Sequence, residues 1–131
     1  MDRRKQIILK SYVLRLSAFF TSFLHTITIL TEFSQGIRQM MIQRKFEQCE
    51  KEIETAMAEN PHCAIPHNLM GILMEKESNH ILAMKHFRAA YALDPTYVPA
   101  RYNMEQYGQM CPTGIFAFSD EDCLNLVQNI M

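Results

Sequence analysis

The stretch HNLMGILM at residues 67–74, followed by AMKHFRAAYALDP at residues 83–95, decides the fold of this 131-residue chain. In the first stretch, four apolar side chains recur at helical spacing: Leu69, Met70, Leu73 and Met74. This pattern predicts an α-helix with one apolar stripe from about Pro66 to Glu77. Pro66 suits the first turn of such a helix, where its missing N–H costs nothing.

A second helix is predicted from Ile81 to Leu93, after the polar break at Ser78-Asn79. It ends at Asp94-Pro95, because the residue before a proline disfavours helical backbone. Gly71 and Ala83 fall where the two helices would cross, and their missing or one-carbon side chains permit close approach. The two stretches together predict an antiparallel helical hairpin.

The spacing of these residues resembles a tetratricopeptide repeat (TPR), a helix–turn–helix unit of 34 residues. The repeat positions that carry the resemblance are Met70, Gly71, Met74, Ala83, Phe87, Ala90 and Pro95. Pro61 lies one repeat length before Pro95, and the best single repeat spans residues 64–97. His67 stands where the family has an aromatic residue. The resemblance implies a unit that holds proteins rather than an enzyme.

The repeats on either side are partial. A shift backward by one repeat predicts a helix from Phe46 to Glu59, preceded by another at about residues 30–43. A shift forward shows that residues 98–104 open a third repeat, which stops at Gly108. The resemblance therefore covers residues 32–108. It implies an all-α fold in which about two to two and a half antiparallel helical hairpins stack as a short TPR-like solenoid.

Residues 1–31 form a basic and hydrophobic N-terminal segment, with five basic residues against one acidic residue. Leu16 to Leu30 reads LSAFFTSFLHTITIL and carries no formal charge. Three interpretations stand: a membrane anchor within residues 7–30, a hydrophobic helix that caps the first repeat, or translated sequence upstream of a start at Met40 or Met41. The rest of the chain holds eight basic and thirteen acidic residues, which argues against a nucleic-acid-binding groove.

Residues 109–131 are predicted to form a loop and a short C-terminal capping helix. Ser119, with an acidic residue three positions on, indicates a helix from Asp120 to Asn129. Its apolar side would carry Leu124, Val127 and Met131. We expect this helix, with Phe116 and Phe118, to cap the last repeat, because a bare apolar end would aggregate. The alternative is that this tail occupies the binding groove.

No catalytic motif is present: the chain has no G-x-S-x-G, no Gly-rich phosphate loop and no H-E-x-x-H. We expect no enzyme activity. His62, Cys63 and His67 are close in sequence, but they lack the spacing of a structural zinc site, so no metal or cofactor is expected. The four cysteines form no C-x-x-C pair, and Cys49 takes a small-residue packing position. Reduced thiols inside the cell are the default expectation.

Function is therefore expected on the concave groove that the resemblance implies. Its inward, partner-binding residues would be Ile65, Asn68, Ile72, Glu75, Tyr102 and Gln106. Some family members capture a C-terminal carboxylate there with Lys and Asn; Asn68 and Asn103 lie near that area, but the lysines are not evident.

The sequence thus predicts a non-catalytic cytoplasmic adaptor that binds an unidentified protein or peptide. One alternative is a self-assembling homo-oligomeric scaffold that stacks through uncapped repeats. The other is a membrane-associated scaffold tethered through residues 7–30.

Overall fold

The computed structural model describes residues 2–130, without the side chains of Asn129 and Ile130, and divides the chain after Glu32 into two units. These residues contain six α-helices and no strand, so the predicted all-α class is confirmed. The helices are α1 (Arg3–Ile42), α2 (Phe46–Glu59), α3 (Ala64–Lys76), α4 (His80–Leu93), α5 (Val98–Tyr107) and α6 (Asp120–Ile130). Helix α1 belongs to the first unit up to Glu32 and to the second unit from Phe33 onward.

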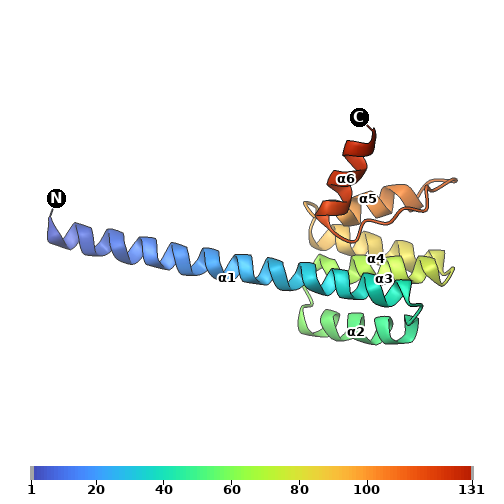
Figure 1. Ribbon diagram of the computed structural model, residues 1–131, viewed down its shortest axis with the longest axis horizontal. Coiled ribbons are helices and arrows are strands. Elements are labelled where there is room, and N and C mark those ends of the chain that lie inside the picture. Colours follow the sequence, from blue (N-terminus) through green and yellow to red (C-terminus); the bar gives the residue numbers. More distant parts are fainter. Residues whose placement is uncertain (1, 131) are drawn as a thin grey trace. The chain divides into compact units, whose positions relative to one another are not determined.

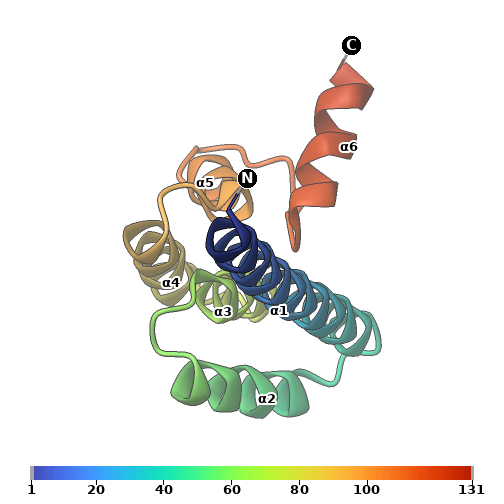
Figure 2. The ribbon, with the colours of Figure 1, turned by 90° about the vertical axis from the view of Figure 1, so that its left-hand side faces the viewer.

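In the second unit the helices follow one another in space as they do along the chain (Figures 1 and 2). Helix α3 packs against α2 and α4, α5 packs against α3 and α4, and α6 packs against α5. The helices end where the sequence indicates, since Asn60-Pro61 follows α2 and Asp94-Pro95 follows α4.

The structure repeats with a constant period. Helices α2 and α4 both have 14 residues, and both their first and their last residues lie 34 positions apart. The turns before them match as well, because Arg44 (φ 59°) and Ser78 (φ 63°) both adopt the left-handed conformation. In each turn an N–H reaches back to the preceding helix: Lys45 to the Met40 carbonyl at 3.0 Å and Asn79 to the Met74 carbonyl at 2.8 Å. This is the bond by which a left-handed residue closes a helix C-terminus.

The centre of the core lies between α3 and α4. Phe87 is the largest fully buried side chain, and Gly71 lies against it. A Cβ placed on Gly71 would lie 2.5 Å from Phe87 Cε1, so a side chain there would collide with the ring. The absence of a side chain at Gly71 lets α3 approach α4 at this point.

The C-terminal part of α1 contributes to this core. Ile37 is 0% exposed and Met41 is 3% exposed, and both pack in the cluster that contains Phe87. Of the three interpretations of the N-terminal segment, a start at Met40 or Met41 would therefore remove Ile37 from the core. A chain that began at Met41 would lack three side chains that pack in or against the hydrophobic core: Phe33, Ile37 and Met40.

Gly36→Ala is expected to raise the free energy of unfolding by about 0.5–1 kcal/mol. Gly36 lies inside α1, where glycine costs backbone entropy, and a Cβ built on it meets nothing within 4 Å. Urea denaturation followed by circular dichroism checks this result. The matched control is Gly71→Ala, which should change stability in the opposite direction.

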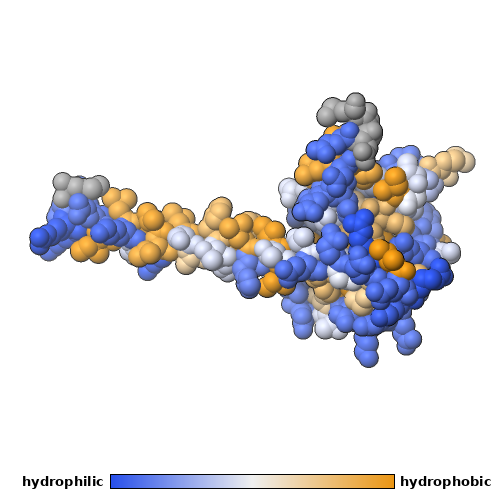
Figure 3. Space-filling model, viewed as in Figure 1, coloured by the Kyte–Doolittle hydropathy of each residue, from blue (hydrophilic) through white to orange (hydrophobic). Residues whose placement is uncertain are grey.

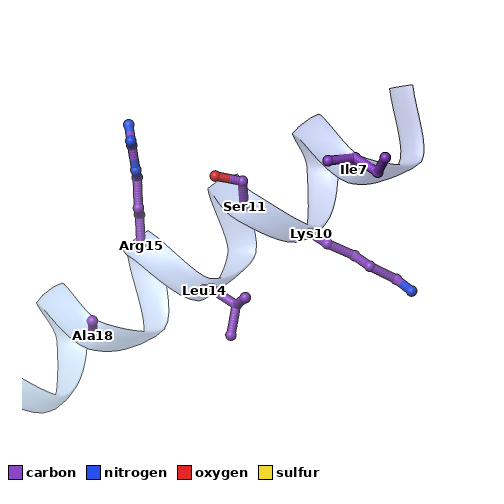
Figure 4. A pocket seen from close by; sticks show the side chains of 6 residues that line it. All are labelled: Ile7, Lys10, Ser11, Leu14, Arg15 and Ala18. Carbon is purple, nitrogen blue, oxygen red and sulfur yellow. The ribbon is translucent and has the colours of Figure 1, made fainter. Parts of the chain in front are cut away.

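In the first unit, residues 2–32, the side chains of residues 2–29 are exposed although many of them are apolar. High hydropathy is spread along this part of the helix (Figure 3). By length and composition α1 is suited to cross a membrane, a property it shares with signal sequences and with the core helices of soluble proteins. A shallow hollow here is lined by residues of this helix alone, between Ile7 and Ala18 (Figure 4), so nothing encloses a ligand.

Candidate functional site

A non-helical stretch before α6, residues 113–119, crosses the second unit and is here called the tail segment. Its end is buried: Ala117 is 0% exposed, Phe118 5% and Ser119 8%. The side chains that hold it come from α1, α3 and α5, which are distant in the sequence. The candidate site is therefore a surface that already carries a peptide segment of its own chain.

Two asparagines bind the peptide backbone at the centre of the tail segment. Asn103 Nδ2 donates to the Ala117 carbonyl at 2.8 Å, and Asn103 Oδ1 accepts from the Ala117 N–H at 2.9 Å. Asn68 Nδ2 donates to the same carbonyl at 3.0 Å. Asn103 Nδ2 also donates to Asn68 Oδ1 at 2.8 Å. Both asparagines are 0% exposed, so these bonds satisfy amides that would otherwise be buried without partners.

This arrangement recognises a main chain rather than a side chain. An Asn side chain carries the same donor and acceptor groups as a peptide unit, so Asn103 pairs with Ala117 much as a neighbouring strand would. These bonds require a residue whose N–H and carbonyl are both free to pair, and the complete burial of Ala117 requires that its side chain be small.

Phe116 is held by an aromatic ring and a cation. Its ring stacks on Tyr107, with the ring centres 4.7 Å apart and the planes 9° from parallel. Lys76 Nζ lies over the Phe116 ring at 5.0 Å from its centre. Both contacts attract an aromatic side chain more than an aliphatic one of similar size.

Phe118 packs in the hydrophobic core cluster, and the Arg38 guanidinium lies 4.9 Å from its ring centre. Arg38 Nη1 also donates to Asp122 Oδ1 at 2.9 Å. Asp122 Oδ2 accepts from the N–H groups of Phe118 and Ser119, so this carboxylate caps α6 and pairs with Arg38 at the same time.

Tyr97, at the start of α5, completes the contacts to Phe118. Its hydroxyl donates to the Phe118 carbonyl at 3.4 Å. Burial, followed by the nearby charge of Asp120, raises the pKa of Tyr97 above its usual range, so the hydroxyl stays protonated and able to donate. We call the six residues that hold the tail segment the tail-binding surface: Arg38, Asn68, Lys76, Tyr97, Asn103 and Tyr107.

The residues predicted to line an open groove are only partly accessible. Asn68 and Ile72 are 0% exposed, so the expectation that they present free surface is wrong. Asn68 is covered by the tail segment, and Ile72 packs in the hydrophobic core. Ile65, Glu75, Tyr102 and Gln106 are half-buried.

Two of the half-buried residues have polar partners. Gln106 accepts from the Thr113 hydroxyl at 3.1 Å, which adds a contact to the tail segment. Glu75 accepts from His80 Nδ1. Tyr102 lies one repeat length after Asn68 in the sequence, and the residue of α5 that bonds to the Asn68 side chain is Asn103.

Most of the tail-binding surface was missed at the sequence level, including Arg38, Lys76, Tyr97 and Tyr107. The available signal was the run Ile115-Phe116-Ala117-Phe118, whose aromatic residues were assigned to a cap. Helix α6 forms as predicted, but Leu124 (64% exposed) and Val127 (56% exposed) contradict an apolar side packed on the last repeat. Met131, assigned to the same side, lies outside the described residues.

Tyr107→Phe is expected to leave the free energy of unfolding unchanged or raise it by about 1 kcal/mol. Among the described residues, the Tyr107 hydroxyl is the buried side-chain polar atom without a hydrogen-bond partner, so its removal relieves a desolvation cost. Burial also raises the pKa of this hydroxyl to about 12. Urea denaturation of both proteins tests the prediction. A loss above about 1 kcal/mol would show that the hydroxyl has a stabilising partner.

A histidine pair joins α3 to α4 beside this surface. His67 Nδ1 and His86 Nδ1 lie 3.2 Å apart, so one ring donates to the other, and the ring centres are 5.5 Å apart. Burial lowers the pKa of both histidines, and His67 lowers that of His86 further. Across the residues that the structure describes, no three His, Cys, Asp or Glu side chains converge as metal ligands would. The contact with His86 places His67 in the packing of α3 against α4.

Acidification is expected to destabilise the protein through this pair. Because the folded pKa values lie below the ordinary value near 6.5, the unfolded chain takes up protons first as the pH falls. Stability contributed by the neutral pair is complete above about pH 7.5 and is lost progressively below about pH 6.5. Urea midpoints at pH 7.5 and 5.5 measure the loss. His67→Gln with His86→Gln should flatten the difference, whereas the exposed control His62→Gln should not.

Comparison with known proteins identified no relative of this chain. No protein-family model matches the chain, and searches of curated proteins and of solved structures found no match.

Proposed function

We propose that residues 33–108 form a short TPR-like solenoid whose tail-binding surface holds an extended segment of a partner protein. The protein would act as a non-catalytic adaptor. The observation that carries the proposal is the backbone pairing of Asn68 and Asn103 with Ala117. A surface that binds one peptide unit through amides can bind the same unit of another chain.

The repeat character is supported by the 34-residue spacing of α2 and α4 and of the left-handed residues Arg44 and Ser78. The loops after these helices match too. Cys63 N–H donates to the Asn60 carbonyl at 3.0 Å, and Tyr97 N–H donates to the Asp94 carbonyl at 3.1 Å. A constant period in helices and turns is typical of helical solenoids, which commonly bind proteins on one face.

The test uses the full chain in mild detergent with Phe116→Ala and Phe118→Ala, which weaken the hold on the tail segment and leave the tail-binding surface intact. A display library of random 12-residue peptides is selected on this variant. We expect enrichment of peptides whose capture is lost when Asn103→Ala is added. A folded variant that enriches no peptide, or enriches peptides indifferent to Asn103, would contradict the proposed function.

We also propose that the first unit tethers this adaptor to a membrane. Apolar side chains of residues 7–29 are exposed, including Leu14 (70%) and Phe19 (71%). The polar side chains there are partly satisfied within the helix. The Thr21, Thr26 and Thr28 hydroxyls donate to the carbonyls four residues earlier, at 2.8, 3.0 and 2.9 Å. Such bonds lower the cost of placing threonine in lipid.

Flotation with lipid vesicles tests the tether. The full chain is expected to float with the vesicles and to resist carbonate extraction. The same chain with Leu14→Gln, Phe20→Gln, Phe23→Gln and Leu24→Gln should remain in solution, because these changes remove apolar surface from the middle of the segment. Equal behaviour of the two chains would remove the basis for a tether.

A further inference from the structure

We infer that the tail-binding surface selects partner segments in which a small residue lies between two aromatic residues and an acidic residue follows four positions after the second. The inference rests on the proposed function and names the ligand class of that same surface. The protein itself carries an example: Phe116-Ala117-Phe118 in the tail segment, followed by Asp122 in α6.

The central position must be small. Ala117 is 0% exposed, and both its N–H and its carbonyl are bonded to buried asparagine amides. A longer side chain at this position would have to displace the packed atoms around it or pull the backbone away from Asn103. The burial of Ala117 and the bonds to its backbone therefore exclude large side chains at this position.

Tyr107 and Lys76 favour an aromatic side chain at the first aromatic position. Tyr107 presents a nearly parallel ring to Phe116, and Tyr107 is itself positioned by Phe87 at 6.2 Å between ring centres. Lys76 adds a cation over the ring of the ligand. An aliphatic residue would keep part of the apolar contact but would lose the stacking and the cation–π attraction.

Arg38 contacts both the second aromatic residue and the acidic residue of the segment. The same guanidinium lies over the Phe118 ring and donates to the Asp122 carboxylate. The acid lies within reach because the chain turns into a helix directly after Phe118, with Asp122 capping the N–H groups of Phe118 and Ser119. A suitable ligand is therefore non-helical up to its second aromatic residue and helical from two residues after it.

A partner segment must displace the tail segment, which is connected to α5 by the exposed residues 108–112. Such a short connection gives the tail an effective concentration in the millimolar range. Cutting this connection removes that advantage without changing any residue of the surface or of the tail segment. Met110, which is fully exposed, is a suitable place for a protease recognition site.

The experiment uses the full chain in mild detergent with such a site inserted between Met110 and Cys111. The probe is a fluorescent peptide of residues 112–128 carrying Cys123→Ser, and its binding is followed by anisotropy before and after cutting. We expect binding to become at least about tenfold tighter after cutting. Peptides with Phe116→Ala, Phe118→Ala or Ala117→Gln should lose about tenfold or more, and Asp122→Asn a few-fold.

The outcomes separate this inference from the proposed function. If the cut protein binds peptides from the random library but does not distinguish the Phe116→Ala and Phe118→Ala peptides from the unaltered probe, the ligand class is wrong and the adaptor function stands. If the cut protein stays helical and binds no peptide of either kind, both are wrong. Loss of helical structure when the cut tail is diluted away would also overturn the inference, since the segment would then be a permanent part of the fold.

The tail-release variant Phe116→Ala with Phe118→Ala gives a second measurement on an uncut chain. It should bind the probe more tightly than the wild-type chain does. Light scattering of the uncut wild-type protein should show a monomer. A dimer that dissociates in this variant would assign the surface to the tail of a second copy, and would overturn the inference of a partner ligand.

Discussion

Replacing Asn103 by alanine is expected to lower the free energy of unfolding by about 2–4 kcal/mol. The change leaves the buried Ala117 N–H without an acceptor and Asn68 Oδ1 without its donor, and each orphaned group costs about 1–3 kcal/mol. Urea denaturation followed by circular dichroism measures the loss. Hydrogen exchange adds a local measurement, because the Ala117 amide should lose its protection.

Asn68→Ala is the matched control. It should cost less than Asn103→Ala, on the order of 1 kcal/mol, because the Ala117 carbonyl keeps Asn103 Nδ2 as a donor and the Ala117 N–H keeps its acceptor. Asn125→Ala, at an exposed position of α6, should stay within about 0.5 kcal/mol of the unaltered protein. If the loss at Asn103 were as small as that at Asn125, the two amides would not hold the tail segment.

Phe87→Ala is expected to cost about 3–5 kcal/mol of unfolding free energy. Phe87 is 0% exposed and is the largest fully buried side chain, so its truncation leaves a cavity between α3 and α4. Thermal and urea unfolding both measure the effect. Tyr91→Ala on the same helix removes a side chain that is 37% exposed and should cost less than about 1 kcal/mol.

A double-mutant cycle tests the contact that explains this effect. Gly71→Ala alone should destabilise by about 1–3 kcal/mol, since the new Cβ would lie 2.5 Å from the Phe87 ring. Combined with Phe87→Leu it should cost less than the sum of the single changes, because the colliding ring atoms are gone. Additive losses of unfolding free energy would show that positions 71 and 87 do not interact.

The helices of the second unit were predictable from local signals. Helix α2 has the predicted bounds, and α4 begins one residue before the predicted Ile81. Prolines after α2 and α4, together with the polar break at Ser78-Asn79, act within a few residues, so one sequence suffices to place them. Helix α3 begins at Ala64, two residues before Pro66, because proline is tolerated throughout the first turn.

The site was less predictable because its parts come from distant positions. Asn68 and the Ala117 carbonyl that it binds are 49 residues apart, and no local pattern links them. The hydrogen bond between Asn68 and Asn103 was also not predicted, because a 34-residue shift identifies equivalent repeat positions and not contacts between side chains. Helix α6 illustrates the same limit: a capping pattern predicts the helix, but helical spacing does not specify which neighbour its apolar side contacts.

The ion pair between Arg38 and Asp122 has a consequence for biosynthesis. It joins positions 84 residues apart, so Asp122 must leave the ribosome before the pair can form. Until Ala117 emerges, the nascent chain carries the Asn68 and Asn103 amides without the backbone groups that they bind in the finished protein. Products truncated before residue 117 should therefore be retained by chaperones or degraded, whereas in chains that include residue 117 its backbone binds both amides.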